Sequence, residues 1–132
     1  MKKIFLSGPI RGLSREESLG WRVEAIKQLE ANFFICHALR GREEKETMPD
    51  PRLAIIRDKN DIDDSDIILL NDSFADASMI GTSMEVLYAF MKNKVIIVFG
   101  HAHNKDYWLN YHIHARVDTL GEACKVINDF YI

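Results

Sequence analysis

Two apolar stretches decide the fold of this chain: Ile67–Leu70 (IILL) and Val95–Phe99 (VIIVF). Each is uninterrupted, which is typical of a parallel strand buried on both faces of a sheet. Between them, the residues from Thr82 to Asn93 have helical character, with Met84, Leu87, Tyr88 and Met91 on one side. A strand, a helix and a further strand in this order predict a parallel βαβ unit.

The sequence around this unit continues the alternation of strands and helices. Further strands are predicted at Ile4–Leu6, Phe33–Cys36 and Ile113–Val117, and a helix over Leu53–Asp63. Two capping boxes, Ser14-x-x-Glu17 and Thr119-x-x-Glu122, predict the starts of two more helices. The residues expected to face inward from these helices are Leu19, Val23, Ile26, Leu29, Leu53, Ile56, Leu120, Ala123, Cys124, Ile127 and Tyr131. The pattern predicts an α/β protein with one doubly wound parallel sheet, covered by helices on both sides.

Two segments do not fit this alternation. The charged stretch Arg40–Pro51 has no periodicity and is predicted to be a loop, whereas His101–His112 is polar and aromatic and cannot be assigned. With 132 residues and no shift in composition along them, the chain is expected to form a single domain, 1–132.

Composition and charge exclude several classes of function. The net charge is −3 and basic residues are interleaved with acidic ones, so neither a nucleic-acid polymer nor a membrane is an expected partner. The apolar run at the N-terminus stops at Ser7, too early for a signal peptide. Cys36 and Cys124 lie in apolar stretches without metal-ligand spacing and are predicted to be reduced core residues. A cytoplasmic location follows as an expectation.

The candidate site lies at the carboxyl ends of the predicted strands, where open α/β sheets bind their ligands. Ser7–Leu13, Asn71–Glu85 and the residues from Gly100 onward are expected to converge there. In the second of these segments, Glu85 has two interpretations. It can cap its helix, because Thr82-x-x-Glu85 is itself a capping box. Alternatively, it is a carboxylate in the crevice that can attack an electron-poor carbon.

Two further features allow both a structural and a functional interpretation. Asp61 can form a surface ion pair with Arg57 one turn earlier, or assist in catalysis. The loop Ser7–Gly12 can be a tight turn, or it can bind a phosphate through free N–H groups, a helix N-terminus and Arg11.

The five histidines do not predict a metal site. His101-x-His103 and His112-x-His114 have the spacing of neighbours on a strand, but no carboxylate or cysteine at a fixed offset completes either pair. No Gly-x-Ser-x-Gly motif surrounds a serine, which argues against a serine hydrolase. No metal and no cofactor are expected.

In combination, three pieces of the sequence resemble the nucleoside 2-deoxyribosyltransferase superfamily over about residues 3–100. They are the first strand with Ser7-Gly8-Pro9, the segment Asn60–Asn71, and Gly81-Thr82-Ser83-Met84-Glu85 with the strand that follows it. The resemblance implies a flavodoxin-like, Rossmann-like sheet. It also implies a homodimer or higher homo-oligomer whose active site is completed by a neighbouring subunit.

The resemblance also implies a retaining mechanism. The nucleophilic glutamate of the superfamily falls on Glu85, which would form a glycosyl ester at the anomeric carbon. An aspartate that assists at the base or the sugar falls on Asp61. This is the chemistry of retaining glycosidases, in which one carboxylate attacks an oxocarbenium-like centre. The residues expected to bind the substrate are Phe5, Ser7, Gly8, Ile10, Arg11, Gly12, Asn71, Met79 and Gly81.

Two departures from the transferase pattern indicate a particular branch. Phe5 stands where transferases usually have a tyrosine, and Met79 where they usually have an aspartate that contacts the base. Nucleotide N-glycosidases use a Gly-x-x-Arg loop for the 5′-phosphate, similar to Gly8-Pro9-Ile10-Arg11, and the cytidylate hydrolases have phenylalanine at the first position. A missing hydroxyl at Phe5 would leave room for a ribose 2′-OH.

The sequence therefore favours a nucleoside 5′-monophosphate N-glycosidase that releases the free base and (deoxy)ribose 5-phosphate. A 2-deoxyribosyltransferase that exchanges bases and a non-catalytic nucleotide sensor remain as alternatives. In every case the expected partner is a small nucleotide or nucleoside. The sequence leaves the identity of the base open.

Overall fold

The computed structural model describes residues 1–41 and 50–131, and within them five parallel strands form one sheet. The strands are β1 (Lys3–Ser7), β2 (Phe34–His37), β3 (Ile67–Asn71), β4 (Val95–Phe99) and β5 (Ala115–Val117). Their order is β2-β1-β3-β4-β5, and every neighbouring pair is parallel. This is the flavodoxin-like order, so the predicted α/β fold class is confirmed. The last strand starts at Ala115, two residues later than predicted.

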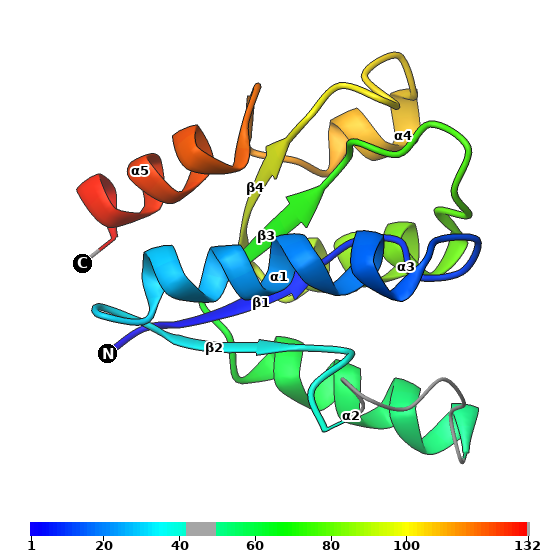
Figure 1. Ribbon diagram of the computed structural model, residues 1–132, viewed down its shortest axis with the longest axis horizontal. Helices are drawn as coiled ribbons and strands as arrows, with labels where there is room; N and C mark the ends of the chain where they lie inside the picture. Colours follow the sequence, from blue (N-terminus) through cyan, green and yellow to red (C-terminus); the bar gives the residue numbers. More distant parts are fainter. Residues whose placement is uncertain (42–49, 132) are drawn as a thin grey trace.

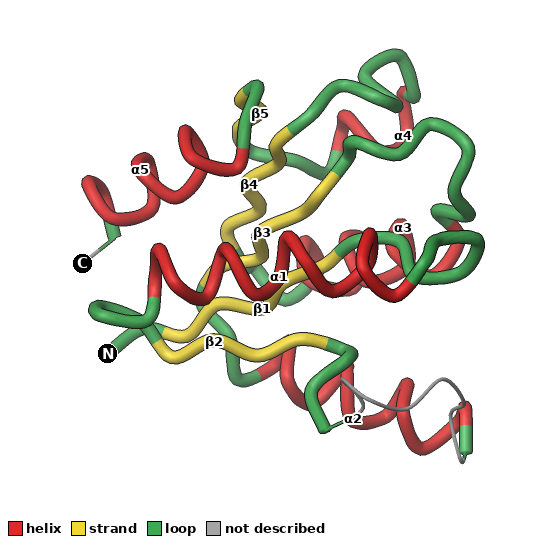
Figure 2. The backbone as a smooth tube through the Cα atoms, viewed as in Figure 1, coloured by secondary structure: helices red, strands yellow, loops and turns green. Residues whose placement is uncertain are grey.

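Helices cover both faces of the sheet (Figures 1 and 2). They are α1 (Arg15–Leu29), α2 (Pro51–Asp63), α3 (Ile80–Met91), α4 (Tyr107–Tyr111) and α5 (Leu120–Phe130). Helices α1 and α5 pack on one face, whereas α2 and α3 pack on the other. The short helix α4 lies in the segment that the sequence left unassigned. Of the predicted loop Arg40–Pro51, residues 42–49 lie outside the described part of the chain.

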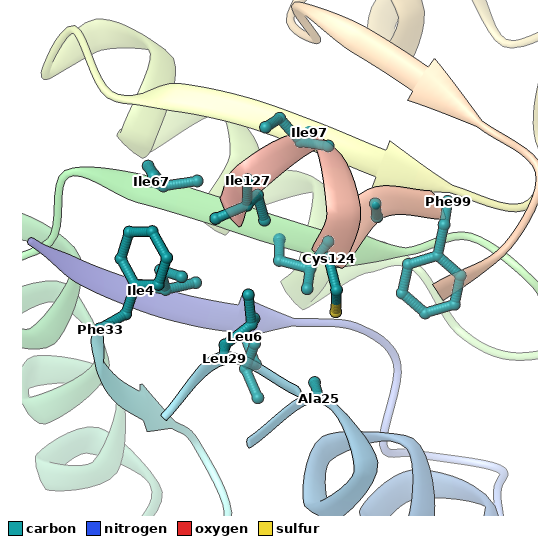
Figure 3. Close-up of a cluster of buried hydrophobic side chains, with 12 residues drawn as sticks. Ile4, Leu6, Ala25, Leu29, Phe33, Ile67, Ile97, Phe99, Cys124 and Ile127 are labelled. Atoms are coloured by element: carbon teal, nitrogen blue, oxygen red, sulfur yellow. The ribbon is translucent and has the colours of Figure 1, made fainter. Parts of the chain in front are cut away.

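Alternation along the strands produces two core clusters, one on each face of the sheet. In β1, Ile4 and Leu6 pack with α1 and α5, in the cluster drawn in Figure 3. Phe5 points the other way and packs with Val86 and Ala89 of α3. Both cysteines are buried and free, as predicted. No helix in the described part of the chain is long and apolar enough to cross a bilayer.

The predicted inward face of α1 is right at Leu29, which is buried, and at Ile26, which packs against the core, but it is wrong at Val23, which is exposed. The buried positions of the helix are Ser18, Arg22, Ala25 and Leu29. A serine and an arginine on the inner face cannot be found by following apolar residues, because apolar periodicity treats both as solvent-facing. The Ser14 capping box that starts this helix is confirmed.

Apolar residues of α2 and α3 also lie where the sequence did not place them. Leu53 and Ile56 are exposed, because the first half of α2 extends past the sheet (Figure 1). Helix α3 begins at Ile80 instead of Thr82 and buries Thr82, Val86 and Ala89. Its other side carries an exposed apolar face, formed by Ile80, Met84, Leu87 and Met91.

Candidate active site

The candidate site lies where β1 and β3 end, at the point where the strand order of the sheet reverses. Ser7 is the last residue of β1 and Asn71 the last of β3, and both are buried. The side chain of Asn71 makes a local turn, because its Oδ1 accepts a hydrogen bond from Ser73 N at 3.0 Å. The structure therefore brings together the first two segments that the sequence expected to converge.

Glu85 of α3 reaches this edge of the sheet. The Oγ atom of Ser7 donates a hydrogen bond of 2.8 Å to Glu85 Oε1. Burial, followed by the negative charge of Asp58, raises the pKa of Glu85 from 4.5 to about 8, although the Ser7 bond and the charge of Arg22 oppose the shift. A carboxyl group with a strongly raised pKa at the ligand-binding edge of an α/β sheet is a candidate functional group.

The capping interpretation of Glu85 is wrong. The N-cap of α3 is Met79, which makes no side-chain capping bond, and Thr82 is a buried residue within the helix. The Glu85 carboxylate is bonded to a residue 78 positions away in the sequence. This contact fixes the side chain against the sheet and has no role in starting the helix.

Asp61 is held in a different way. Its carboxylate is buried and forms a bidentate pair with Arg40, with N–O distances from 2.8 to 3.1 Å. The sequence offered Arg57 as an alternative partner of Asp61, but the ion pair of Asp61 in the described part of the chain is with Arg40. Arg57 instead donates to the carbonyl oxygens of Ala38 and Arg40.

The carboxylate whose negative charge acts on Glu85 is Asp58 of α2. Sequence reasoning did not single out this residue. Asp58 also acts electrostatically on the buried Arg22. Helix α2 follows β2 in a parallel sheet and therefore begins at the carboxyl edge. A residue three positions earlier lies about 4.5 Å nearer that edge. Asp58 and Asp61 lie on the same side of α2. The direction in which α2 runs from the carboxyl edge of the sheet could therefore have indicated that Asp58 is nearer that edge.

The loop after β1 is drawn tightly against β3. A side chain at Gly8 would place its Cβ 3.0 Å from Trp21 Cζ2 and 3.3 Å from Asn71 Cβ, so only glycine fits without movement. Arg22 Nη2 donates to the Gly8 carbonyl at 3.0 Å. Gly12 has a φ of +87°, which favours glycine. Ile10 is partly buried and Arg11 is exposed at the surface of the loop.

The remaining expected site residues have other surroundings. Phe5 is fully buried in the core, on the same face of β1 as Ser7. Gly81 is exposed in the first turn of α3. Met79 lines a hollow of about 460 Å³ between α3 and α4, bordered also by Ile80, Ser83, Met84, Val86, Leu87, Asp106, Trp108, Leu109 and His112.

The third expected segment contains a polar network that the sequence did not predict. Asp72 is buried and accepts from Arg116 Nη1 at 2.8 Å, and its carboxylate lies 2.6 Å from His103 Nδ1. These bonds attach the loop after β4, through His103, and strand β5, through Arg116, to the end of β3. His101 instead lies 2.6 Å from Asp118. Within residues 1–41 and 50–131, no three metal-binding side chains gather into one group.

Compared by sequence, the chain matches no protein-family model and no curated protein. Solved structures give clear similarities. The 2-deoxyribosyltransferase of Bacillus psychrosaccharolyticus superposes with a TM-score of 0.69 at 13% identity, over 91% of this chain and 88% of that one. This chain has the fold of the 2-deoxyribosyltransferases. The 2-desoxiribosyltransferase of Leishmania mexicana gives 0.71 at 13% identity, over 100% of both chains.

A solved N-glycosidase has the same fold. The CMP N-glycosidase BcmB of Clostridium botulinum superposes with a TM-score of 0.66 at 19% identity, over 99% of this chain and 100% of that chain. The fold implied by the sequence resemblance is therefore confirmed. At these identities the comparison establishes the fold and leaves the reaction to be argued from the residues.

Proposed function

We propose that this protein hydrolyses the N-glycosidic bond of a nucleoside 5′-monophosphate, with Glu85 as the nucleophile. The observation that carries the proposal is the Glu85 carboxyl group. It is partly buried at the carboxyl edge of the sheet, held by Ser7, and has a pKa raised to about 8. The sensor alternative does not account for it, because a module that only binds an anionic ligand gains nothing from a buried carboxylate near the sugar.

The proposed reaction has two steps. A Glu85 carboxylate oxygen forms a bond to C1′ as the bond from C1′ to the base nitrogen breaks, and the departing base receives a proton from an acid. Water then attacks C1′ of the ester and gives its proton to the same acid, now a base. The products are free base and ribose 5-phosphate, and Glu85 is regenerated.

We assign the acid to Asp58, where the sequence resemblance suggested Asp61. Both oxygens of the Asp61 carboxylate are engaged by the Arg40 guanidinium, so this side chain is already occupied by an ion pair. After burial, the negative charge of Asp58 is the second cause of the raised pKa of Glu85, which makes Asp58 an acidic neighbour of the nucleophile. The proposed reaction requires Glu85 as the anion and a proton on Asp58.

The loop Gly8–Gly12 is proposed to bind the 5′-phosphate. Arg11 is exposed on the loop and free to turn toward an anion, and the close fit of Gly8 against β3 holds the loop at the site. Phe5, Ser7, Ile10, Asn71, Met79 and Gly81 complete the set of residues that we propose for the substrate pocket. Phe5 in place of tyrosine leads us to expect that ribonucleotides are accepted.

The alternative enzyme is a 2-deoxyribosyltransferase, in which a second base replaces water. It is favoured by the fold shared with the two transferases described above. The experiment that tests the proposal is to incubate the protein with CMP, dCMP, UMP and the matching nucleosides, with and without an added free base. Base release from CMP without an acceptor supports the hydrolase. Release only from deoxynucleosides, and only with an added base, would establish the transferase.

We also propose that the protein is a homo-oligomer that uses the exposed face of α3 and α4. Trp108 and His112 border the hollow beside α3 and also a second hollow that Tyr107 and Tyr111 line, so the two apolar surfaces are continuous. Exposed aromatic side chains of about 150–250 Å² each would make this patch larger than monomers usually expose. Its exposed side chains Ile80, Met84, Leu87, Tyr107, Trp108 and Tyr111 are large and without formal charge, which suits contact with a second copy of the chain. Light scattering should show a monomer for Met84→Glu combined with Trp108→Glu.

The free, buried thiols of Cys36 and Cys124 fit a reducing compartment, and we propose that the protein acts in the cytoplasm.

A further inference from the structure

Arg22 is a fully buried arginine on the inner face of α1. Its Nη1 donates to the Ser18 carbonyl, and its Nη2 donates to the Gly8 carbonyl at 3.0 Å. The guanidinium carbon lies 4.6 Å from the centre of the Trp21 ring. A buried arginine is rare and costly unless something compensates its charge, so the groups around it decide what it does.

The bond to Gly8 places Arg22 directly behind the candidate site. Gly8 follows Ser7, and the Ser7 hydroxyl holds Glu85 at 2.8 Å. We propose that Arg22 is a positioning residue that holds the β1–α1 loop by its Gly8 carbonyl and, from there, stabilises the Glu85 carboxylate that Ser7 binds. The inference rests on the proposed function, because it explains how the nucleophile is held as a carboxylate.

The electrostatic surroundings support this role. Burial lowers the pKa of Arg22 to about 10, so the guanidinium stays charged at neutral pH, and the attraction to Glu85 opposes that shift more than the attraction to Asp58 does. Three elements act on Glu85: β1 through Ser7, α2 through Asp58 and α1 through Arg22. Ser7 and Arg22 lower the pKa of Glu85, whereas burial and Asp58 raise it. Arg22 therefore acts against the two influences that would keep the proton on the nucleophile.

The test is a direct titration of Glu85, which needs no turnover. The intact protein is labelled with ¹³C at the glutamate side-chain carboxyls, and the Glu85 resonance is the one missing from Glu85→Gln. In Arg22→Met its midpoint should move up by about one pH unit from the wild-type value. Lys27→Met, which removes a positive charge from an exposed position of the same helix, is the matched control and should leave the midpoint in place.

A second variant of Arg22 separates the effect of its charge from its hydrogen bond to the β1–α1 loop. It also provides a test if Arg22→Met does not fold. Arg22→Gln removes the charge but keeps an amide donor for the Gly8 carbonyl, so it should show the same upward shift with a KM for CMP closer to that of the wild type. An unchanged Glu85 midpoint in whichever of the two variants folds would overturn the inference.

Activity gives an independent measurement. In Arg22→Met the kcat/KM for CMP should fall about tenfold at neutral pH, and the limb of the pH profile that follows the ionisation of Glu85 should move up with the Glu85 midpoint. A lower plateau with both limbs in place would mean a purely structural role and would contradict the inference. If wild type releases no base from any nucleotide, the proposed function fails, while the titration still decides whether Arg22 controls the charge of Glu85.

Discussion

Glu85 and Asp61 were the two carboxylates that the sequence assigned to catalysis, and the structure surrounds them very differently. Asp61 faces the guanidinium of Arg40 and receives two-pronged, charge-assisted hydrogen bonds. Glu85 receives a single bond from the neutral hydroxyl of Ser7 and lies under the repulsion of Asp58. A carboxylate paired with an arginine stabilises the fold. A carboxylate held beside another acid has a perturbed pKa, which is typical of groups that take part in a reaction.

Replacing Glu85 tests most directly whether it is the catalytic carboxylate. Glu85→Gln keeps the size and the hydrogen bond to Ser7 but removes the nucleophilic oxygen, so base release from CMP should fall at least about a thousandfold. Circular dichroism should show an intact fold. Near wild-type turnover in the folded variant would remove Glu85 from the mechanism.

Replacing Asp58 and Asp61 one at a time by asparagine tests which of the two aspartates acts as the acid. Asp58→Asn should lower kcat/KM for CMP by about a hundredfold, because it removes the proposed acid, and it should lower the midpoint of Glu85. Asp61→Asn is the matched control on the same helix. It should keep activity within about threefold and lose about 1–2 kcal/mol of stability, a figure reduced because the Arg40 side chain is 43% exposed. The opposite ranking would return the catalytic role to Asp61.

Arg11 tests whether the loop after β1 belongs to the same site. A charge-assisted contact with phosphate contributes about 1.5–3 kcal/mol, so wild type should prefer CMP over cytidine by about one to two decades in kcat/KM. Arg11→Ala should lose most of that preference while turnover of cytidine stays the same. Equal kcat/KM values for CMP and cytidine in the wild type would contradict phosphate binding and favour the transferase.

These contrasts also explain how far the sequence could be read. The buried strands, such as Ile67–Leu70, were predictable because uninterrupted apolar runs have few other uses. Their carboxyl ends then predicted where a ligand would bind, and Glu85 lies at that edge of the sheet. Arg22 could not be predicted, since a polar residue on an inner helix face contradicts the rule used to find that face. The choice between Asp58 and Asp61 depended on the direction of α2 relative to the sheet, which apolar periodicity does not report.

The raised pKa of Glu85 predicts a dependence of stability on pH. Between about pH 4.5 and 8, the folded protein keeps a proton that the unfolded chain releases, so wild-type stability should fall as pH rises through this range. Glu85→Gln lacks this group and should be the more stable protein by a few kcal/mol at pH 9, with little difference near pH 4. Denaturant unfolding of both proteins at several pH values measures the effect. Parallel curves would mean that Glu85 titrates normally.

Phe5 gives the smallest and most discriminating test, because it separates the two enzyme alternatives. Its ring is fully buried. It lies on the same face of β1 as Ser7, whose hydroxyl binds Glu85. A tyrosine hydroxyl there would offer Glu85 a second donor and crowd a ribose 2′-OH.

Phe5→Tyr should therefore lower the ratio of CMP to dCMP turnover by about tenfold, which corresponds to roughly 1.4 kcal/mol. Its melting temperature should stay close to that of the wild type, since the new hydroxyl finds a partner. The contrary result is an unchanged ratio with a loss of about 1–3 kcal/mol, as expected for a buried hydroxyl without a hydrogen bond. In that case Phe5 is only a core residue, and the preference for ribonucleotides loses its main support.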